Sequence, residues 1–207
     1  MIFVIEHLDV LSKWILAEYK HSYEIAKNEK VDLLITGVKI EGLPSTEKRF
    51  YEIFNPENVI ILDPQAEEEL KPNDKAEAII IGGILGDHPL RGRTKTLLSD
   101  IFPKAKKRNI GKLQFPIDGA LYVAIQIMKG KRLSEIPIVF GLSIITNFKG
   151  LEEEIYLPFA YPLVNGSPLI SEEVIKYLVG NRNYRLKWGG KEEEIEFNYQ
   201  GQSFLSR

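Results

Sequence analysis

Hydrophobic and polar positions follow two periodicities along the first two thirds of the chain. Short apolar runs, typical of buried strands, alternate with stretches in which apolar residues recur at helical spacing. The runs that predict strands are Phe3–Ile5, Val31–Thr36, Asn58–Leu62, Ala76–Gly83 and the basic Lys104–Ile110. The stretches that predict helices are the one capped by Ser12, then Ser45–Phe54, Arg93–Phe102 and Pro116–Gly130. This alternation predicts an α/β domain with a mostly parallel sheet and helices on both faces.

The pattern changes after Ile136, where strand-like runs dominate. The expected elements are a β-pair over Ile138–Phe148 and Glu154–Pro162, a short helix over Ser171–Val179, and a hairpin over Tyr184–Tyr199. The hairpin turns at Gly189-Gly190, as glycine pairs favour. We therefore predict a main domain over residues 1–180 and a C-terminal β-hairpin extension over residues 181–207.

Composition narrows the possible chemistry. The chain has 207 residues, enough for a sizeable core, and no apolar stretch near the roughly 20 residues that span a bilayer. It contains no cysteine, which excludes disulfides, thiolate metal sites and cysteine nucleophiles. Its three histidines show no metal-ligand spacing, so no metal site is expected. These features predict a cytoplasmic protein that does not bind membranes.

Positive charge gathers in one segment, although the whole chain carries a net charge of −2. Between Arg91 and Lys112 eight basic residues accompany a single acid, Asp100. A solvated face explains such a run, and so does a basic rim beside a pocket that contacts RNA phosphates. Both interpretations stay open.

Several predicted strands end in polar or glycine-rich segments. The first ends in Glu6-His7, the third in Asp63-Pro64, the fourth in Gly82–Pro89, and the basic strand in Asn109–Gln114. Because ligands bind beyond the carboxyl ends of parallel strands, these segments predict a ligand pocket at one sheet edge. The glycine-rich segment matches neither the P-loop nor the dinucleotide signature, and tight turns alone could also explain it.

These residues carry a family resemblance. Phe3–Leu8, Trp14, Glu18-Tyr19, Leu62-Asp63-Pro64 and above all Gly82–Thr94 resemble one branch of the SPOUT methyltransferases. That branch contains eukaryotic arginine methyltransferases of ribosomal proteins and archaeal members described as RNA methyltransferases. The resemblance covers about residues 1–178 and leaves the C-terminal hairpin outside.

The resemblance implies a trefoil-knotted fold that holds S-adenosyl-L-methionine. It implies a protein substrate, such as a ribosomal or other translation protein, and a monomer. An RNA substrate is the first alternative, and a ribosome-associated module without catalysis is the second. The residues implied in cofactor binding are Leu62, Asp63, Pro64, Gly82, Gly83, Ile84, Gly86, Ile110, Gly111, Lys112, Leu113 and Gln114.

Methyl transfer to arginine requires a group that holds the guanidinium and accepts a proton, which a carboxylate can do. The candidate catalytic residues are Glu6, Asp87 and Asp118. Each has an ordinary structural explanation: a strand-end charge for Glu6, a turn residue for Asp87 and a helix-start charge for Asp118. Trp14 is expected in the core, although an exposed aromatic ring beside carboxylates would suit a guanidinium.

The histidines and arginines near this edge are expected to act mainly within the fold. His7 is interpreted as a hydrogen-bonded structural residue, and His88 as a residue that shapes the loop before Pro89. For Arg91 and Arg93 we favour a bond to a carboxylate inside the protein over contact with a nucleic-acid phosphate.

Overall fold

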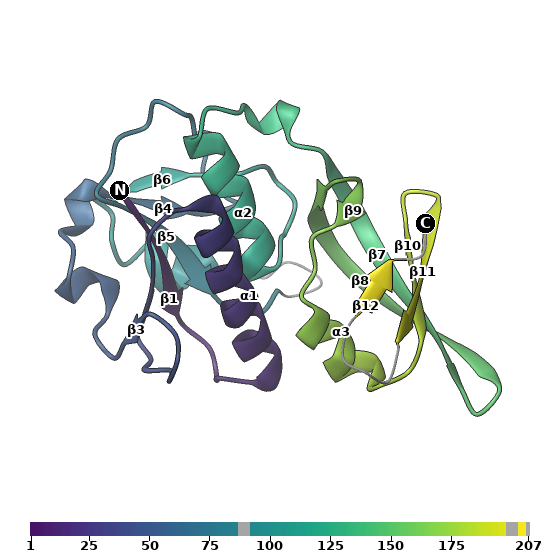
Figure 1. Cartoon of the computed structure of the whole chain (residues 1–207). Coiled ribbons are helices and arrows are strands. Elements are labelled where there is room, and N and C mark those ends of the chain that lie inside the picture. The colour runs from purple at the N-terminus through teal and green to yellow at the C-terminus, as the bar shows by residue number, and fades with distance from the viewer. Residues whose placement is uncertain (87–91, 198–202, 206–207) are drawn as a thin grey trace.

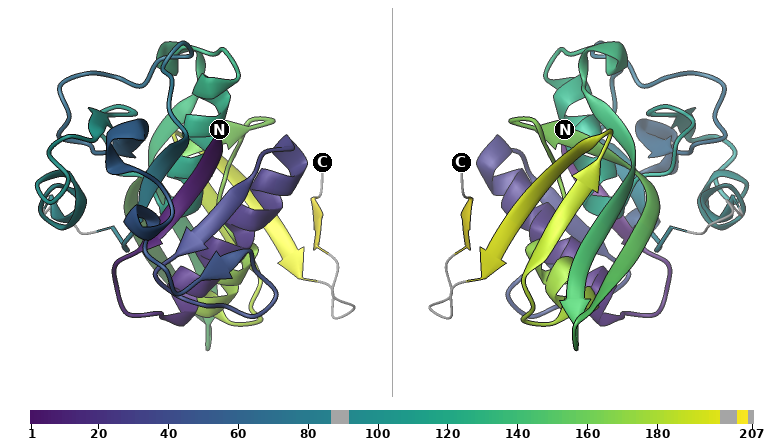
Figure 2. Two further views of the ribbon diagram at one scale, coloured as in Figure 1. Left: turned by 90° about the vertical axis from the view of Figure 1, so that its left-hand side faces the viewer. Right: turned by 90° about the vertical axis from the view of Figure 1, so that its right-hand side faces the viewer.

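Two six-stranded sheets face each other across a layer of helices (Figures 1 and 2). This computed structural model describes residues 1–86, 92–197 and 203–205. The first sheet is parallel and is formed by the N-terminal part of the chain, whereas the second is antiparallel and C-terminal. No helix in the described ranges is long and apolar enough to cross a membrane.

The parallel sheet confirms the predicted strands and has the order β3-β2-β1-β5-β4-β6. Its strands are β1 (Ile2–His7), β2 (Leu33–Thr36), β3 (Ser45–Thr46), β4 (Val59–Leu62), β5 (Ala78–Gly83) and β6 (Lys106–Arg108). The central pair β1 and β5 is in register from Ile2 opposite Ala78 to His7 opposite Gly83. Because all six strands are parallel, their carboxyl ends meet at one edge.

Two helices cover one face of this sheet. Helix α1 (Lys13–Glu29) begins after Ser12, whose hydroxyl accepts from the Ile15 amide at 3.2 Å, so the predicted cap is confirmed. Helix α2 (Ile117–Met128) begins after Pro116, one residue later than the sequence predicts. Their apolar faces join Phe3 and Ile5 of β1 in the largest core cluster.

Short helical segments cover the opposite face. Phe50 in a 3-10 turn (Phe50–Glu52) and Leu98 in a π-helical turn (Lys95–Ser99) pack on Val4 and Ile80. The helix predicted over 93–102 forms over residues 93–99, with a π-helical turn as its larger part. The helix predicted over 45–54 is wrong, because this segment holds strand β3 and a 3-10 turn. The Ser45 hydroxyl bonds to the backbone of Ile40 and Leu43, which stabilises a turn in place of a helix.

The second sheet has the order β12-β11-β10-β7-β8-β9. Its strands are β7 (Ile138–Phe148), β8 (Leu151–Val164), β9 (Ser167–Pro168), β10 (Tyr184–Trp188), β11 (Lys191–Phe197) and β12 (Ser203–Leu205). Helix α3 (Glu172–Val179) packs on this sheet and contacts α1. The predicted hairpin forms as β10 and β11, and β10 pairs directly with β7.

Candidate functional site

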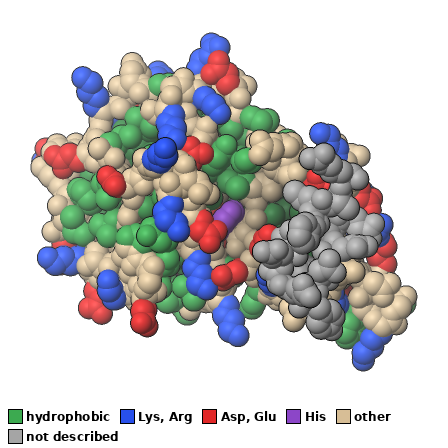
Figure 3. Space-filling view, in the orientation of Figure 1, with side chains coloured by type: hydrophobic (Ala, Val, Ile, Leu, Met, Phe, Trp, Pro, Cys, Tyr) green, Lys and Arg blue, Asp and Glu red, His purple; other side chains and the backbone are tan. Residues whose placement is uncertain are grey.

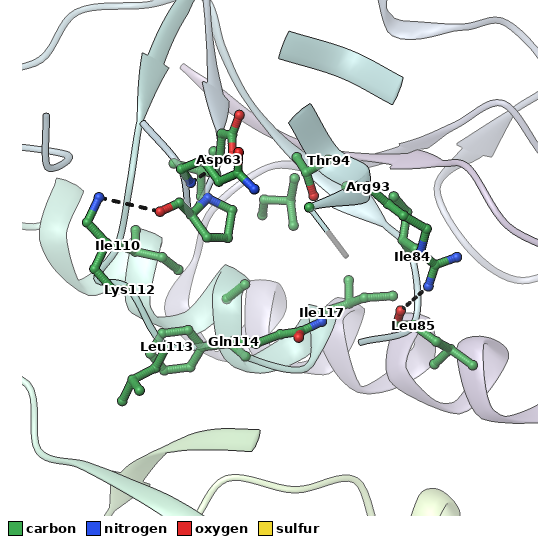
Figure 4. A pocket seen from close by; sticks show the side chains of 18 residues that line it. Asp63, Ile84, Leu85, Arg93, Thr94, Ile110, Lys112, Leu113, Gln114 and Ile117 are labelled. Atoms are coloured by element: carbon green, nitrogen blue, oxygen red, sulfur yellow. Dashed lines mark hydrogen bonds between the residues drawn. The ribbon is translucent and has the colours of Figure 1, made fainter. Parts of the chain in front are cut away.

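A cavity of about 230 Å³ lies at the carboxyl edge of the parallel sheet, where β4, β5 and β6 end beside the start of α2. We call it the main cavity. In Figure 4, Ile110, Lys112 and Leu113 lie at one end, Ile84, Leu85 and Arg93 at the other, and Gln114 between them. The residues that line it are Leu62, Asp63, Pro64, Gln65, Ile81, Gly82, Ile84, Leu85, Gly92, Arg93, Thr94, Ile110, Lys112, Leu113, Gln114, Phe115, Ile117 and Ala120.

Most of the residues expected to bind a cofactor meet in this cavity. Nine of them line it: Leu62, Asp63, Pro64, Gly82, Ile84, Ile110, Lys112, Leu113 and Gln114. Gly83 instead lies under α1, where a Cβ atom would overlap the Tyr19 hydroxyl. Gly111, with φ +99°, turns the chain after β6 and does not line the cavity. Gly86, the third exception, lines a smaller neighbouring cavity. That these residues bind a cofactor stays a prediction.

The charged side chains of the main cavity are bonded within the protein. Asp63 accepts from the Gln65 amide at 2.9 Å and from the Ser99 hydroxyl at 2.6 Å. Lys112 donates to the Ala66 carbonyl at 2.8 Å. Arg93 pairs with Asp9 at 3.2 Å and donates to the Leu85 carbonyl at 2.6 Å, which confirms its expected internal role. The remaining surface is largely apolar side chains and backbone.

A second cavity of about 120 Å³ adjoins the first. We call it the acidic cavity. Trp14, Glu18, Leu85, Gly86, Pro116 and Phe159 line it. Leu85 lines both cavities, so the two spaces meet at the segment that follows β5. Gly86 allows a close approach here, because a Cβ atom would lie 2.5 Å from the Phe159 ring and 2.7 Å from the Gln114 amide.

Glu18 is the carboxyl group of the acidic cavity. It lies on α1 and is buried, yet it accepts from the Trp14 indole at 2.6 Å and from the Ile117 amide at 3.0 Å. Burial is the main cause that raises the pKa of Glu18 to about 8, and the nearby charge of Asp118 adds to it. The two hydrogen-bond donors have the opposite, smaller effect on this pKa. A buried carboxyl group with a pKa near neutrality is suited to exchange a proton.

Asp118 lies behind Glu18, at the start of α2. It is buried, and its carboxylate is 2.6 Å from the imidazole Nδ1 of His21. Burial alone would lower the pKa of His21, but the hydrogen bond and the charge of Asp118 outweigh it and raise that pKa. Asp118 lines neither the main nor the acidic cavity.

Of the other two predicted catalytic carboxylates, only Glu6 belongs to the described residues. Glu6 is fully buried on the sheet face opposite α1, where it pairs with Arg49 and accepts from the Thr36 hydroxyl and the Phe50 amide. It lines neither cavity, so the structure does not bring Glu6 and Asp118 together. Asp87 lies outside the described residues, as do His88 and Arg91.

His7 is a structural residue, as the sequence predicted. Its Nδ1 lies 2.8 Å from the Tyr19 hydroxyl, and the two rings meet edge to face with their centroids 5.9 Å apart. Burial lowers the pKa of His7, which keeps the ring neutral at physiological pH. His7 therefore joins β1 to α1 and is not placed to act as a base in either cavity.

Most described side chains of the basic segment are bonded within the protein. Its side chains pair with acids or donate to carbonyls: Lys104 with Glu57, Lys106 with Asp74, Arg108 with Asp74 and Glu68, Lys107 with the carbonyls of Phe102 and Pro103. On the face shown in Figure 3, basic and acidic side chains are interspersed. This arrangement favours a solvated, internally paired face over a continuous basic rim.

Comparison with known proteins identifies the family. The model of the family "Protein arginine N-methyltransferase SFM1-like" matches residues 2–185. This chain belongs to that family. It is 27% identical over 201 residues to protein arginine N-methyltransferase SFM1 of Saccharomyces cerevisiae, an alignment that covers 84% of this chain and 92% of the yeast protein.

Solved structures agree with this assignment. The yeast SFM1 enzyme complexed with SAH (S-adenosylhomocysteine) superposes with a TM-score of 0.70 and 26% identity, covering 86% of this chain and 94% of that one. The complex with SAM (S-adenosylmethionine) gives the same TM-score and identity, with 86% and 89% covered. A Trm10 protein of Thermococcus kodakaraensis shares the fold, with a TM-score of 0.52, 21% identity, and 65% and 96% covered. The expected SPOUT-class α/β methyltransferase fold is confirmed.

Three residues in or beside the acidic cavity were not predicted as functional groups: Glu18, His21 and Phe159. Glu18 belonged to the segment that carried the resemblance but was given no role. Its spacing from Trp14 and His21, four and three residues along a helix, is the signal that places all three on one face. Phe159 gave no such signal, because its contact with Gly86 joins segments 73 positions apart.

Proposed function

We propose that this chain transfers a methyl group from S-adenosylmethionine, bound in the main cavity, to an arginine side chain bound in the acidic cavity. The observation that carries the proposal is the position of Glu18. A single buried carboxyl group faces a small space walled by Trp14 and Phe159, directly beside a larger apolar cavity. Aromatic faces and a carboxylate are the groups that recognise a guanidinium.

The lining of the main cavity fits the cofactor. An adenine ring needs apolar walls and backbone partners, and Leu62, Ile110 and Leu113 with their neighbours supply these. The two described cations of the cavity are already engaged within the protein, because Lys112 donates to a carbonyl and Arg93 bonds to a carbonyl and to Asp9. A ligand that carries a sulfonium and no phosphate is compatible with this surface.

The proposed chemistry assigns one task to each wall of the acidic cavity. S-adenosylmethionine, when bound, supplies the methyl group on a positively charged sulfur and leaves as S-adenosylhomocysteine. Trp14 and Phe159 hold the guanidinium plane, and the Glu18 carboxylate orients one nitrogen toward the main cavity. As the new N–C bond forms, that nitrogen loses a proton, which Glu18 accepts. The methylated guanidinium keeps its single positive charge.

We propose a basic ribosomal or translation protein as the substrate. The internal pairing of the basic segment argues for a protein over RNA, because paired lysines and arginines release few counterions from a nucleic acid. The trefoil knot, the monomeric state and the cytoplasmic location stay predictions from the sequence.

Labelling of salt-washed ribosomes tests the proposal. With methyl-labelled S-adenosylmethionine, we expect label in protein, and Glu18→Gln should lower its incorporation about 100-fold, since the variant lacks the proton acceptor. Cofactor affinity should stay unchanged, because Glu18 lines only the acidic cavity. Glu173→Gln, which alters an exposed ion pair with Lys20, is the matched control and should label normally.

Other outcomes would contradict parts of the proposal. Label in RNA would replace the arginine substrate by the RNA alternative. Full activity of Glu18→Gln would remove Glu18 from the chemistry. Cofactor binding without any label would contradict a ribosomal substrate, and an absence of cofactor binding would favour a ribosome-associated module without catalysis.

A further inference from the structure

His21 lies at the solvent side of a buried pair of carboxyl groups. Glu18 and His21 are three residues apart on α1, so both face the start of α2, where Asp118 lies. The imidazole Nδ1 is 2.6 Å from Asp118, and the His21 side chain is 17% exposed against 2% for Asp118. His21 is thus the most solvent-exposed member of the group, Asp118 is buried behind it, and Glu18 lines the acidic cavity.

Among the described residues, no second cation pairs with Glu18 or Asp118. Tyr161 of β8 and Tyr19 of α1 face the carboxyl groups, and both are buried and neutral, because burial and the nearby carboxylates raise their pKa values. Glu24 of α1 and Glu172 of α3 lie nearer His21 and favour its charged form. Within the described chain, neither Glu18 nor Asp118 forms an ion pair with a lysine or arginine.

Two buried carboxyl groups with only one basic partner between them differ in how readily each ionises. The partner bonds to Asp118 alone, so negative charge is most stable there. Asp118 also accepts from the Gly119 amide at 2.7 Å. Glu18 is left as the group whose ionisation costs most, until a cation enters the acidic cavity.

We propose that His21 is a positioning residue that acts through Asp118. It fixes the negative charge on Asp118 and leaves Glu18 as the carboxyl group that exchanges a proton with a bound guanidinium. When a guanidinium enters, Glu18 releases its proton to solvent, and the ionised carboxylate holds the substrate. During methyl transfer this carboxylate then takes the proton that the substrate nitrogen loses. The inference rests on the proposed function only in naming the guanidinium as that cation.

Titration of Glu18 by carbon NMR tests the inference without any activity assay. In protein labelled at the glutamate side-chain carboxyl carbon, the Glu18 signal is assigned by its loss in Glu18→Gln. In His21→Gln, the amide can still donate to Asp118 but carries no charge. We expect this variant to raise the titration midpoint of Glu18, because a neutral amide offsets the negative charge of Asp118 less than the imidazole, whose pKa is raised by that contact.

A matched variant separates this effect from a general change of charge. Lys20→Gln removes one positive charge from the adjacent position of α1, where the side chain is 45% exposed and pairs with Glu173. It should leave the Glu18 midpoint unchanged. An unaltered midpoint in His21→Gln, or an equal shift in Lys20→Gln, would overturn the inference.

Addition of N-acetyl-arginine amide tests the link to the substrate. In the wild-type protein, we expect this probe to lower the Glu18 midpoint, and S-adenosylmethionine binding should be equal in all variants. A midpoint that responds to His21→Gln but not to the probe would support the role of His21 and overturn the guanidinium assignment. The two proposals therefore fail separately.

Discussion

At the scale of single residues, the role of each buried carboxyl group depends on whether it faces a cavity and whether it has a basic partner. Glu6, Glu18 and Asp118 are all buried, but only Glu18 faces an open space. Glu6 and Asp118 each have a basic partner, Arg49 and His21. The sequence shows three acids near strand and helix ends, and it cannot show which one is left without a cation.

Glu6 should therefore matter for stability. We expect Glu6→Gln to lower the free energy of unfolding by about 2 kcal/mol, because Arg49 loses its buried partner. The exposed pair of Glu57 and Lys104 is the control, and Glu57→Gln should cost less than about 0.5 kcal/mol. Urea unfolding measures both. Normal stability combined with lost methyl transfer would restore Glu6 as a catalytic residue.

The pH dependence of the reaction should follow Glu18. Its pKa is raised, so the protonated form prevails below about pH 8 and the carboxylate above it. Because the carboxylate is the proton acceptor, we expect kcat/KM to rise about tenfold per pH unit below that value and to level off above it. Initial rates between pH 6 and about pH 9 measure the profile. A flat profile would exclude Glu18 as the base.

At the scale of elements, hydrophobic periodicity predicted the strands and the two long helices, because local pattern and tertiary burial agree there. It failed at Ser45–Phe54, where a serine side chain and backbone pairing with β2 decide the conformation. Parallel strands bring their ends together, so segments after β4, β5 and β6 line the main cavity as expected, whereas the fourth expected segment, Glu6-His7, does not. The acidic cavity needed Phe159 from β8, which no local pattern indicates.

The end of β5 is sensitive to side-chain size at Gly83. A Cβ atom at Gly83 would overlap the Tyr19 hydroxyl and lie 2.9 Å from the Glu6 carbonyl oxygen. We expect Gly83→Ala to lower the free energy of unfolding by about 2 kcal/mol through this overpacking. At Gly82 the nearest atom is Thr94 Oγ1 at 3.4 Å, an ordinary contact, so Gly82→Ala should fold normally. Equal stability of both variants would contradict this account, and thermal unfolding measures it.

At the scale of the whole molecule, the C-terminal hairpin shares a sheet with the rest of the chain. β10 pairs with β7 over four residues and buries Tyr184, Leu186 and Trp188. The sequence suggested an extension after residue 180, because the resemblance stops near that point. Pairing between distant strands is a tertiary property, so the division of the chain into 1–180 and 181–207 stays a prediction that truncation can test.

Removal of residues 184–207 should prevent stable folding of the antiparallel sheet. It takes three large side chains out of the core, each worth roughly 2 kcal/mol of burial. We expect the shortened chain to melt well below the full-length protein. A chain that ends at residue 197 keeps β10 and β11 and is the control, with a melting temperature close to that of the full chain. Independent melting of the hairpin would support the two-unit division.

The close contact of Gly86 with the Phe159 ring brings the two sheets together at the acidic cavity. The residues that line the main cavity, the proposed donor site, all lie between Leu62 and Ala120, whereas one side of the acidic cavity, the proposed acceptor site, comes from β8. Changes along β8 could thus retune which arginine-bearing protein is accepted without touching the donor's surroundings. Descendants of one ancestral enzyme could acquire new targets by remodelling a single strand.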